Sequence, residues 1–240
     1  MRSIFVGVEY AGKSTLIGLL GNYYQHRKLR THGDDHFTLP DASLSPESRK
    51  ELINYPEDVK ERMQRMQIHY HVDIIKKYEY PLLGGWHIEE WVYDTFYGKN
   101  PDSPYYGRYN YHFQRLYESL VLDAHLPDVV LIHVKADKET IAQRMQETPH
   151  EYQIIHEKDV EELQKLFDEE VSKSLFTHQG RLVELDTTGK TAEESFDELL
   201  KLTEPLITTA EMALRAVPVP EGDYEVVYEA GVRKMVPQEG

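Results

Sequence analysis

The sequence has no cysteine and no long apolar run. The absence of cysteine excludes disulfide frameworks and thiolate-ligated metal sites. The longest apolar runs, such as residues 129–132, extend over only a few positions, whereas a membrane-crossing helix needs about 20. The N-terminal residues lead directly into a glycine-rich motif instead of the apolar stretch of a signal peptide. We therefore expect a cytoplasmic protein without a membrane segment.

Positive charge is also scarce. The 27 Lys and Arg residues face 42 Asp and Glu residues, which gives a net charge of −15. This charge repels phosphate backbones, so we do not expect a nucleic-acid partner. A small anionic ligand remains compatible with it, because a few oriented backbone amides act at short range. The length of 240 residues predicts one main core with small attachments.

Apolar residues recur with alternating strand and helix spacing along the chain. Strands are expected at residues 2–8, 28–32, 86–92, 128–134 and 181–186. Helices are expected at residues 13–25, 54–80, 110–122, 138–146 and 158–175, and from 192 onward. This alternation predicts an α/β fold, with a doubly wound, five-stranded parallel sheet flanked by helices.

The long helix expected at residues 54–80 carries large apolar side chains at helical spacing. We expect them to be buried in the core and not to bind a cofactor; they are Val59, Met63, Met66, Tyr70 and Ile74. Residues 33–48, just before this helix, are rich in Asp, Pro and Ser and are expected to form turns.

The last part of the chain contains residues that are typical of the start and the end of a helix. Thr191 and Glu194 have the spacing of a capping box, and Pro205 is expected to interrupt the final helical stretch. Residues 217–240 follow that stretch. They are interpreted as an appended hairpin around residues 229–231 or as a simple tail.

Residues 7–14, GVEYAGKS, match the phosphate-binding pattern GxxxxGK[ST]. The motif follows an expected strand and precedes an expected helix, as this pattern requires. Its glycines let backbone amides converge on phosphates, while Lys13 reaches the terminal phosphates and the Ser14 hydroxyl ligates Mg²⁺. The alternative is an ordinary glycine-rich turn with a surface lysine. We assign ATP binding to Gly7, Tyr10, Ala11, Gly12, Lys13, Ser14 and Thr15.

Two other classes of phosphate-loop protein fit poorly. In a guanine-nucleotide switch, residues 134–137 would read NKxD, but Val134 replaces the asparagine. The DxxG element of that class matches only residues 186–189, which come after this segment instead of before it. A motor-type ATPase needs an apolar run that ends in adjacent acidic groups, and residues 86–90 match this only in part.

Beyond the phosphate loop, the order of elements over residues 1–215 resembles the thymidylate kinase and deoxynucleoside kinase family. Residues 71–85 are similar to the helix and turn that lead into the family's third strand, and residues 126–131 are similar to its Pro-Asp-apolar strand. The resemblance implies a kinase-like domain over residues 1–216, with a lid-like segment at about 147–158. It also implies an ATP- and Mg²⁺-dependent transfer of phosphate to a nucleotide or nucleoside, and it allows a homodimer.

The resemblance implies roles for individual residues. Glu9 matches an acidic phosphate-loop residue that contacts the substrate sugar. Glu89 matches an acidic residue that ends the third strand and acts on the acceptor or, with Ser14, on Mg²⁺. Two arginines are candidates for substrate contacts without matching a family position. Arg65 lies about one turn before the family's phosphate-binding arginine, and Arg108 lies beside several tyrosines, with a surface position as its alternative.

Arginines are missing where the family usually carries them. Neither residues 8–11 nor residues 145–180 contain an arginine, and Glu90 follows Glu89 where the family has an arginine. Arg144 and Lys158 flank the lid-like segment and are the nearby cations that could replace the lid arginine. This departure leaves open an ATP-binding regulatory module without efficient transfer.

A second candidate acceptor site follows the second expected strand. The sequence Asp34, Asp35, His36, Phe37 resembles the Asp-Asp-Phe element of uridine and pantothenate kinases, in which an aspartate accepts the acceptor's proton. Asp35 would then be the base of a kinase that acts on another hydroxyl-bearing metabolite. An ordinary Asp-rich turn is the alternative.

Overall fold

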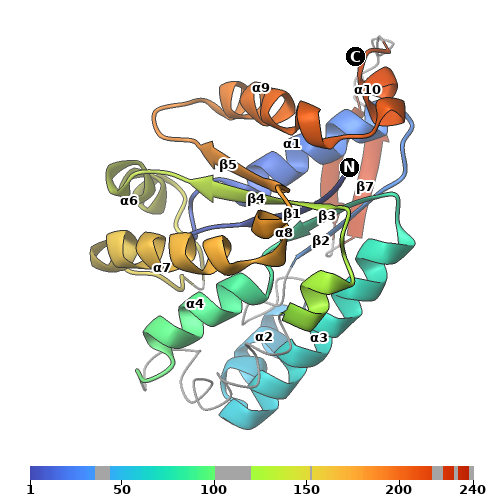
Figure 1. Cartoon of the computed structure of the whole chain (residues 1–240). Helices are drawn as coiled ribbons and strands as arrows, with labels where there is room; N and C mark the ends of the chain where they lie inside the picture. The colour runs from blue at the N-terminus through green and yellow to red at the C-terminus, as the bar shows by residue number, and fades with distance from the viewer. Residues whose placement is uncertain (36–43, 101–119, 152, 218–223, 230–231, 238–240) are drawn as a thin grey trace.

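The computed structural model describes residues 1–35, 44–100, 120–151, 153–217, 224–229 and 232–237. Five parallel strands form one sheet in the order β2-β3-β1-β4-β5 (Figure 1). Their bounds are Arg2–Val6 (β1), Thr31–Asp35 (β2), Tyr80–Gly84 (β3), Val129–Lys135 (β4) and Leu182–Asp186 (β5). The predicted doubly wound parallel sheet is therefore confirmed.

Helices cover both faces of the sheet (Figure 1). On one face lie α1 (Lys13–His26) and α9 (Ala192–Thr203). On the other face lie α3 (Glu57–Lys77), α4 (His87–Tyr97), α6 (Lys138–Glu147), α7 (Val160–Lys173) and α8 (Leu175–His178). Other elements are α2 (Pro46–Ile53), η2 (Glu157–Asp159), η3 (Glu204–Leu206), α10 (Thr209–Arg215) and the antiparallel hairpin of β6 (Tyr224–Glu229) and β7 (Val232–Pro237). Residues 120–124 are also helical.

The strands are apolar on both sides because both faces of the sheet are buried. In β1, Ile4 and Val6 belong to the core cluster under α4 and α7, and Phe5 between them belongs to the cluster under α1. All three side chains are fully buried. The end of β1 is therefore rigidly held where the glycine-rich motif begins.

The prediction that residues 86–92 form the third strand is wrong. The third strand is β3, and residues 87–97 form helix α4. The buried side chains of Ile88, Val92 and Tyr93 recur at helical spacing, and Glu89 with Glu90 places negative charge in the first turn, where the helix dipole favours it. The long helix α3 ends at Lys77, three residues earlier than predicted, so that residues 80–84 can form β3.

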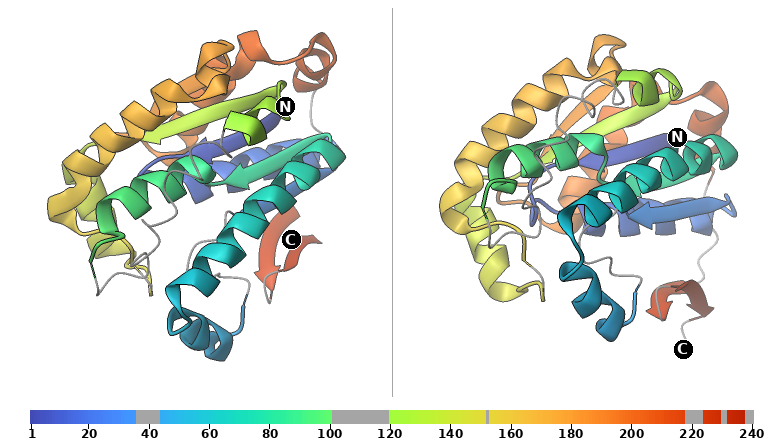
Figure 2. Two further views of the ribbon diagram at one scale, coloured as in Figure 1. Left: turned by 60° about the horizontal axis from the view of Figure 1, so that its bottom comes forward. Right: turned by 90° about the horizontal axis from the view of Figure 1, so that it is seen from below.

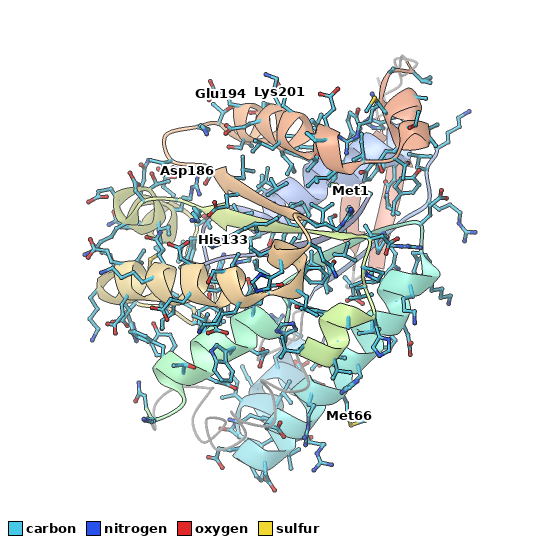
Figure 3. All side chains as sticks on the ribbon, in the orientation of Figure 1. Met1, Met66, His133, Asp186, Glu194 and Lys201 are labelled. Carbon is cyan, nitrogen blue, oxygen red and sulfur yellow. The ribbon has the colours of Figure 1, made fainter. Side chains whose placement is uncertain are left out.

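The prediction that the stripe on α3 is buried is also largely wrong. Met66 is 65% exposed, Tyr70 is 52% exposed and Val59 is 39% exposed, whereas Ile74 is buried. A helix of 21 residues is about 30 Å long, about twice the length of a five-residue strand. Only the end of α3 covers the sheet, and the rest extends past it toward α2 (Figure 2), with Met66 on its exposed side (Figure 3).

Several smaller predictions can be compared with the structure. The second strand begins at Thr31, three residues later than predicted, and α2 occupies part of the span expected to be turns, with Ser45 as its cap. The capping box of Thr191 and Glu194 is confirmed, as is the break at Pro205. No helix in the described part of the chain is both long and apolar enough to cross a membrane.

Candidate functional site

The glycine-rich motif forms a tight loop between β1 and α1. Gly7 has φ of 147°, and a Cβ atom there would lie 2.1 Å from the carbonyl oxygen of Val134 in β4. Gly12 has φ of 104° just before the first turn of α1. Both positions therefore require glycine. The residues assigned to ATP binding all lie in this loop or in the following turn of α1, namely Gly7, Tyr10, Ala11, Gly12, Lys13, Ser14 and Thr15.

The Lys13 ammonium group points back into the loop. Its Nζ donates to the carbonyl oxygens of Gly7 at 2.6 Å and Val8 at 3.1 Å. It also lies 3.2 Å from Oε1 of Glu89. The loop thus holds one positive charge at the point where its backbone turns toward α1.

Glu89 reaches the loop from α4. Its Oε1 accepts a hydrogen bond from the backbone N–H of Gly7 at 3.2 Å, and the residue is only 8% exposed. The structure thus brings together Lys13 and Glu89, although Glu89 lies in the first turn of a helix and not at the end of a strand. A carboxylate and a lysine meet beside the amide of the first glycine.

A buried polar cluster fixes the start of α4. Asp123 accepts hydrogen bonds from Nε1 of Trp86 at 2.9 Å and from the Ser174 hydroxyl at 3.1 Å, and its carboxylate lies 2.7 Å from Nε2 of His87. Burial raises the pKa of Asp123, but the contacts with His87, Trp86 and Ser174 outweigh burial, so the pKa lies below its ordinary value. This cluster holds the turn that aims Glu89 at the loop.

Glu9 contacts residues 147–151 and 153–158, which the sequence resemblance predicts to be lid-like and which we call the lid segment. Its Oε2 accepts hydrogen bonds from the backbone N–H groups of Ile154 at 2.9 Å and Ile155 at 3.3 Å. Its Oε1 lies 2.5 Å from Nδ1 of His150. The backbone N–H of Glu9 in turn donates to the Tyr93 hydroxyl at 3.1 Å. Both carboxylate oxygens of Glu9 are therefore engaged by the lid segment.

Tyr10 holds the same segment through its ring and its hydroxyl. The ring stacks on His150, with 4.1 Å between the ring centroids. The hydroxyl accepts from the backbone N–H of His150 at 2.8 Å and donates to Oε1 of Gln153 at 3.2 Å. Tyr10 has φ of 67°, an unusual backbone conformation for a residue with a side chain.

Arg144 lies against the opposite side of the loop. Its guanidinium group donates to the carbonyl oxygen of Tyr10 at 3.0 Å and to the hydroxyl of Thr187 at 3.0 Å. The Thr187 hydroxyl also donates to the carbonyl oxygen of Ala11 at 2.9 Å. Sequence reasoning missed Thr187, although its position just after β5 is a signal. Lys158, the other cation predicted near the lid, is exposed in η2.

The predicted acceptor residues lie at the carboxyl end of β2. Oδ2 of Asp34 is 3.6 Å from Nε2 of the buried His71 and 3.8 Å from Nε2 of His32. Asp35 is the last residue of β2 and pairs with Gly84 of β3. Strand β3 separates β2 from β1, so these groups lie two strands from the phosphate loop.

Two arginines on α2 and α3 have carboxylate partners. Arg65, predicted as a substrate contact, lies 3.4 Å from Oε2 of Glu61 on the same helix. Arg49, which sequence reasoning did not single out, donates to Oε2 of Glu151 at 3.3 Å and so joins α2 to the lid segment. Three predicted substrate contacts lie outside the described residues, namely His36, Phe37 and Arg108.

A second group of possible metal ligands lies on β4, β5 and α7. His133, Asp168 and Glu184 come within reach of one cation, but Nζ of Lys135 already lies 2.6 Å from each carboxylate. Burial, and next the charge of Lys135, lowers the pKa of His133 to about 4, so the imidazole is neutral at pH 7. Lys135 therefore supplies the positive charge that this group needs.

Comparisons with known proteins show the fold but no close relative. No family model and no curated protein matches the sequence. A solved thymidylate kinase from Candida albicans is 13% identical and has a TM-score of 0.54, over 85% of this chain and 90% of that chain. A deoxyadenosine kinase from M. mycoides with dCMP and dCDP bound is 13% identical and has a TM-score of 0.55, over 86% of this chain and 100% of that chain. The chain therefore has the α/β fold of these kinases, with the sheet order given above.

Proposed function

We propose that the protein is an ATP-dependent phosphotransferase that acts on a nucleoside or nucleotide. The observation that carries this proposal is the meeting of Lys13 and Glu89 at the amide of Gly7. Phosphoryl transfer depends mainly on positioning and on neutralising charge, and a P-loop with its lysine supplies both. The fold shared with thymidylate and deoxyadenosine kinases supports the same class of reaction.

Each residue at the loop has a distinct task in this proposal. The loop amides and Lys13 bind the phosphates and neutralise charge that develops during transfer. Glu89 orients the acceptor hydroxyl and accepts its proton. The Ser14 hydroxyl and the Glu89 carboxylate are the hard oxygen donors that Mg²⁺ prefers, so they fit this ion, which shields phosphate charge when bound.

The charges around the site favour a neutral acceptor. A nucleoside hydroxyl needs a carboxylate to take its proton, whereas a monophosphate needs cations to hold it. Glu89 and Asp34 offer carboxylates, while Arg65 is paired with Glu61 and Arg144 is bonded to the loop backbone. We therefore propose a nucleoside as the acceptor.

Two other functions are kept as candidates. The lid segment contains no arginine. This favours, as a second possibility, a module that binds ATP without efficient transfer. A kinase for another hydroxyl-bearing metabolite, with Asp35 as base, is the third. In all three we assign residues 1–216 to the nucleotide-binding domain and residues 217–240 to an accessory hairpin.

A turnover assay with ATP separates these functions. The full chain is incubated with ATP, Mg²⁺ and a panel of nucleosides, their monophosphates and simple hydroxylated metabolites. Transfer to nucleosides supports the first proposal, transfer only to other metabolites supports the third, and ATP binding without transfer supports the regulatory module. Preference for a monophosphate would contradict the neutral acceptor.

The Lys13→Ala variant tests the loop itself. Removing the main cation should lower kcat/KM by about 10²–10³-fold, as the loss of one charge-stabilising donor does elsewhere. The control is Lys173→Ala, because Lys173 is exposed at the end of α7, where it pairs with Glu170. Normal turnover in Lys13→Ala would exclude the loop as the phosphate site.

A further inference from the structure

We propose that Glu9 is a positioning residue that holds the lid segment against the phosphate loop before any ligand binds. The sequence resemblance assigns Glu9 to the substrate sugar instead. The effect that we expect on catalysis rests on the proposed function. The attachment of the lid segment to the loop does not depend on that function. The inference follows from the contacts of Glu9 and Tyr10, two consecutive loop residues that bond to the segment.

Backbone amides of the lid segment need partners, because residues 153–156 belong to no helix or strand. An amide that is buried without a partner is costly. One oxygen of Glu9 satisfies the amides of Ile154 and Ile155, and the Ile155 side chain is fully buried. The phosphate loop therefore provides acceptors that the lid segment lacks within itself.

The charge of Glu9 strengthens this attachment. Hydrogen bonds to an ionised carboxylate are about twice as strong as neutral ones. The second oxygen of Glu9 contacts His150, and the Glu9 side chain is only 13% exposed. With both oxygens engaged, the carboxylate in this arrangement faces the lid segment and not an acceptor.

Tyr10 adds a second attachment one residue further along the loop. Its positive φ is held from two sides, since Arg144 binds its carbonyl oxygen and His150 stacks on its ring. Such a conformation persists only where the surroundings determine it. The loop thus presents two consecutive side chains to the same segment.

This attachment has a consequence for catalysis. A lid that carries arginines is drawn toward bound phosphates by their charge, but this lid segment has no arginine, and its one lysine, Lys158, is exposed in η2. The position of the segment depends on the loop instead of on the ligand. A closed lid excludes water from the phosphates, so we expect Glu9 to favour transfer to the acceptor over hydrolysis.

Amide hydrogen exchange of the full chain without ligand tests the attachment. In Glu9→Ala, exchange at Ile154 and Ile155 should rise about tenfold or more, as expected for the loss of charge-assisted bonds, while exchange in β4 stays unchanged. Glu9→Gln should retain most of the protection, because its carbonyl oxygen can accept both amide bonds. The control is Glu139→Ala, at an exposed position in the first turn of α6.

The outcomes separate the two roles of Glu9. Unchanged exchange at Ile154 and Ile155 in Glu9→Ala would overturn the proposal. If the same variant then raised only the KM for the acceptor, the result would support a contact between Glu9 and the substrate sugar instead. If the wild-type chain transfers phosphate, Glu9→Ala should also raise ATP hydrolysis relative to transfer. The exchange measurement needs no turnover, so it decides the attachment even if the proposed kinase activity is not found.

Discussion

In the proposed reaction Glu89 is the carboxylate that accepts the proton, and the structure gives this residue two contacts at the phosphate loop. It is anchored to the loop amide of Gly7, and it lies beside the Lys13 ammonium group. The anchor fixes its position, and the positive charge of the lysine lies 3.2 Å from one carboxylate oxygen. Under the proposed function, the same carboxylate would both order the loop and accept a proton.

The Glu89→Gln variant separates these two tasks. The amide side chain keeps an oxygen for the Gly7 N–H but cannot take a proton, so kcat should fall by about 10²–10⁴-fold while ATP affinity changes little. Steady-state kinetics and ATP titration measure the two effects, with the exposed Glu79→Gln as control. An unchanged kcat would move the base to Asp34 or Asp35.

Two glycines near the loop should respond in opposite ways to alanine. Gly7→Ala places a Cβ against the carbonyl oxygen of Val134 at a positive φ, and we expect it to lower the free energy of unfolding by more than about 4 kcal/mol. Gly18 lies in α1 with no atom within 4 Å of an added Cβ. Gly18→Ala should therefore raise that free energy by about 0.5–1 kcal/mol.

Chemical denaturation of the three proteins tests this pair. If Gly7→Ala were as stable as wild type, β4 would have to shift easily to make room for the extra Cβ atom. The close approach of Gly7 to β4 would then not explain why glycine occupies position 7.

At the level of elements, α3 divides into a half that covers the sheet and a half that does not. Ile75 is 1% exposed near the end of the helix, whereas Met66 is 65% exposed in its middle. Ile75→Ala should cost about 2–5 kcal/mol of unfolding free energy, because it leaves a cavity. Met66→Gln should change the free energy by less than about 0.5 kcal/mol. A large loss in Met66→Gln would show that this side of α3 is covered in solution.

The alternation of strands and helices could be predicted from the sequence, but the identities of two elements, β3 and α4, could not. Residues 86–92 alternate Trp86, Ile88 and Glu90 as a strand would, and Ile88 and Val92 are also four residues apart as in a helix. Short apolar stretches do not distinguish the two. The third strand is identified by its pairing with β1, which places it at residues 80–84. The sequence pattern did not show that α3 ends early enough, at Lys77, to leave these residues for a strand.

The candidate site was predictable only where one local motif defines it. The phosphate loop needs no distant partner, so its residues follow from eight consecutive positions. The contacts of Glu9 with Ile154 and of Arg144 with Thr187 join segments far apart in the sequence. Nothing in the spacing of those residues indicates that they meet.

For the whole molecule, His133 should make the fold sensitive to acid. Burial lowers its pKa from 6.5 to about 4, so the unfolded chain binds a proton on this residue at a higher pH than the folded chain does. Stability is therefore full above pH 6.5 and falls as the pH drops toward 4, by up to about 3 kcal/mol.

Denaturation curves over this pH range should show a smaller loss of stability in His133→Gln than in wild type. The exposed His178→Gln is the matched control and should follow wild type. Parallel pH dependences of wild type and His133→Gln would contradict this prediction.

The chain carries only two tryptophans: Trp86 caps the start of α4, and Trp91 lies within this helix. Trp86 is fully buried and bonded to Asp123, so its emission depends on this polar contact and on exclusion of water. Fluorescence excited selectively in tryptophan thus reports on the start of α4. Because Glu89 lies three residues after Trp86, a ligand that displaces Glu89 from the loop should change that signal without any attached dye.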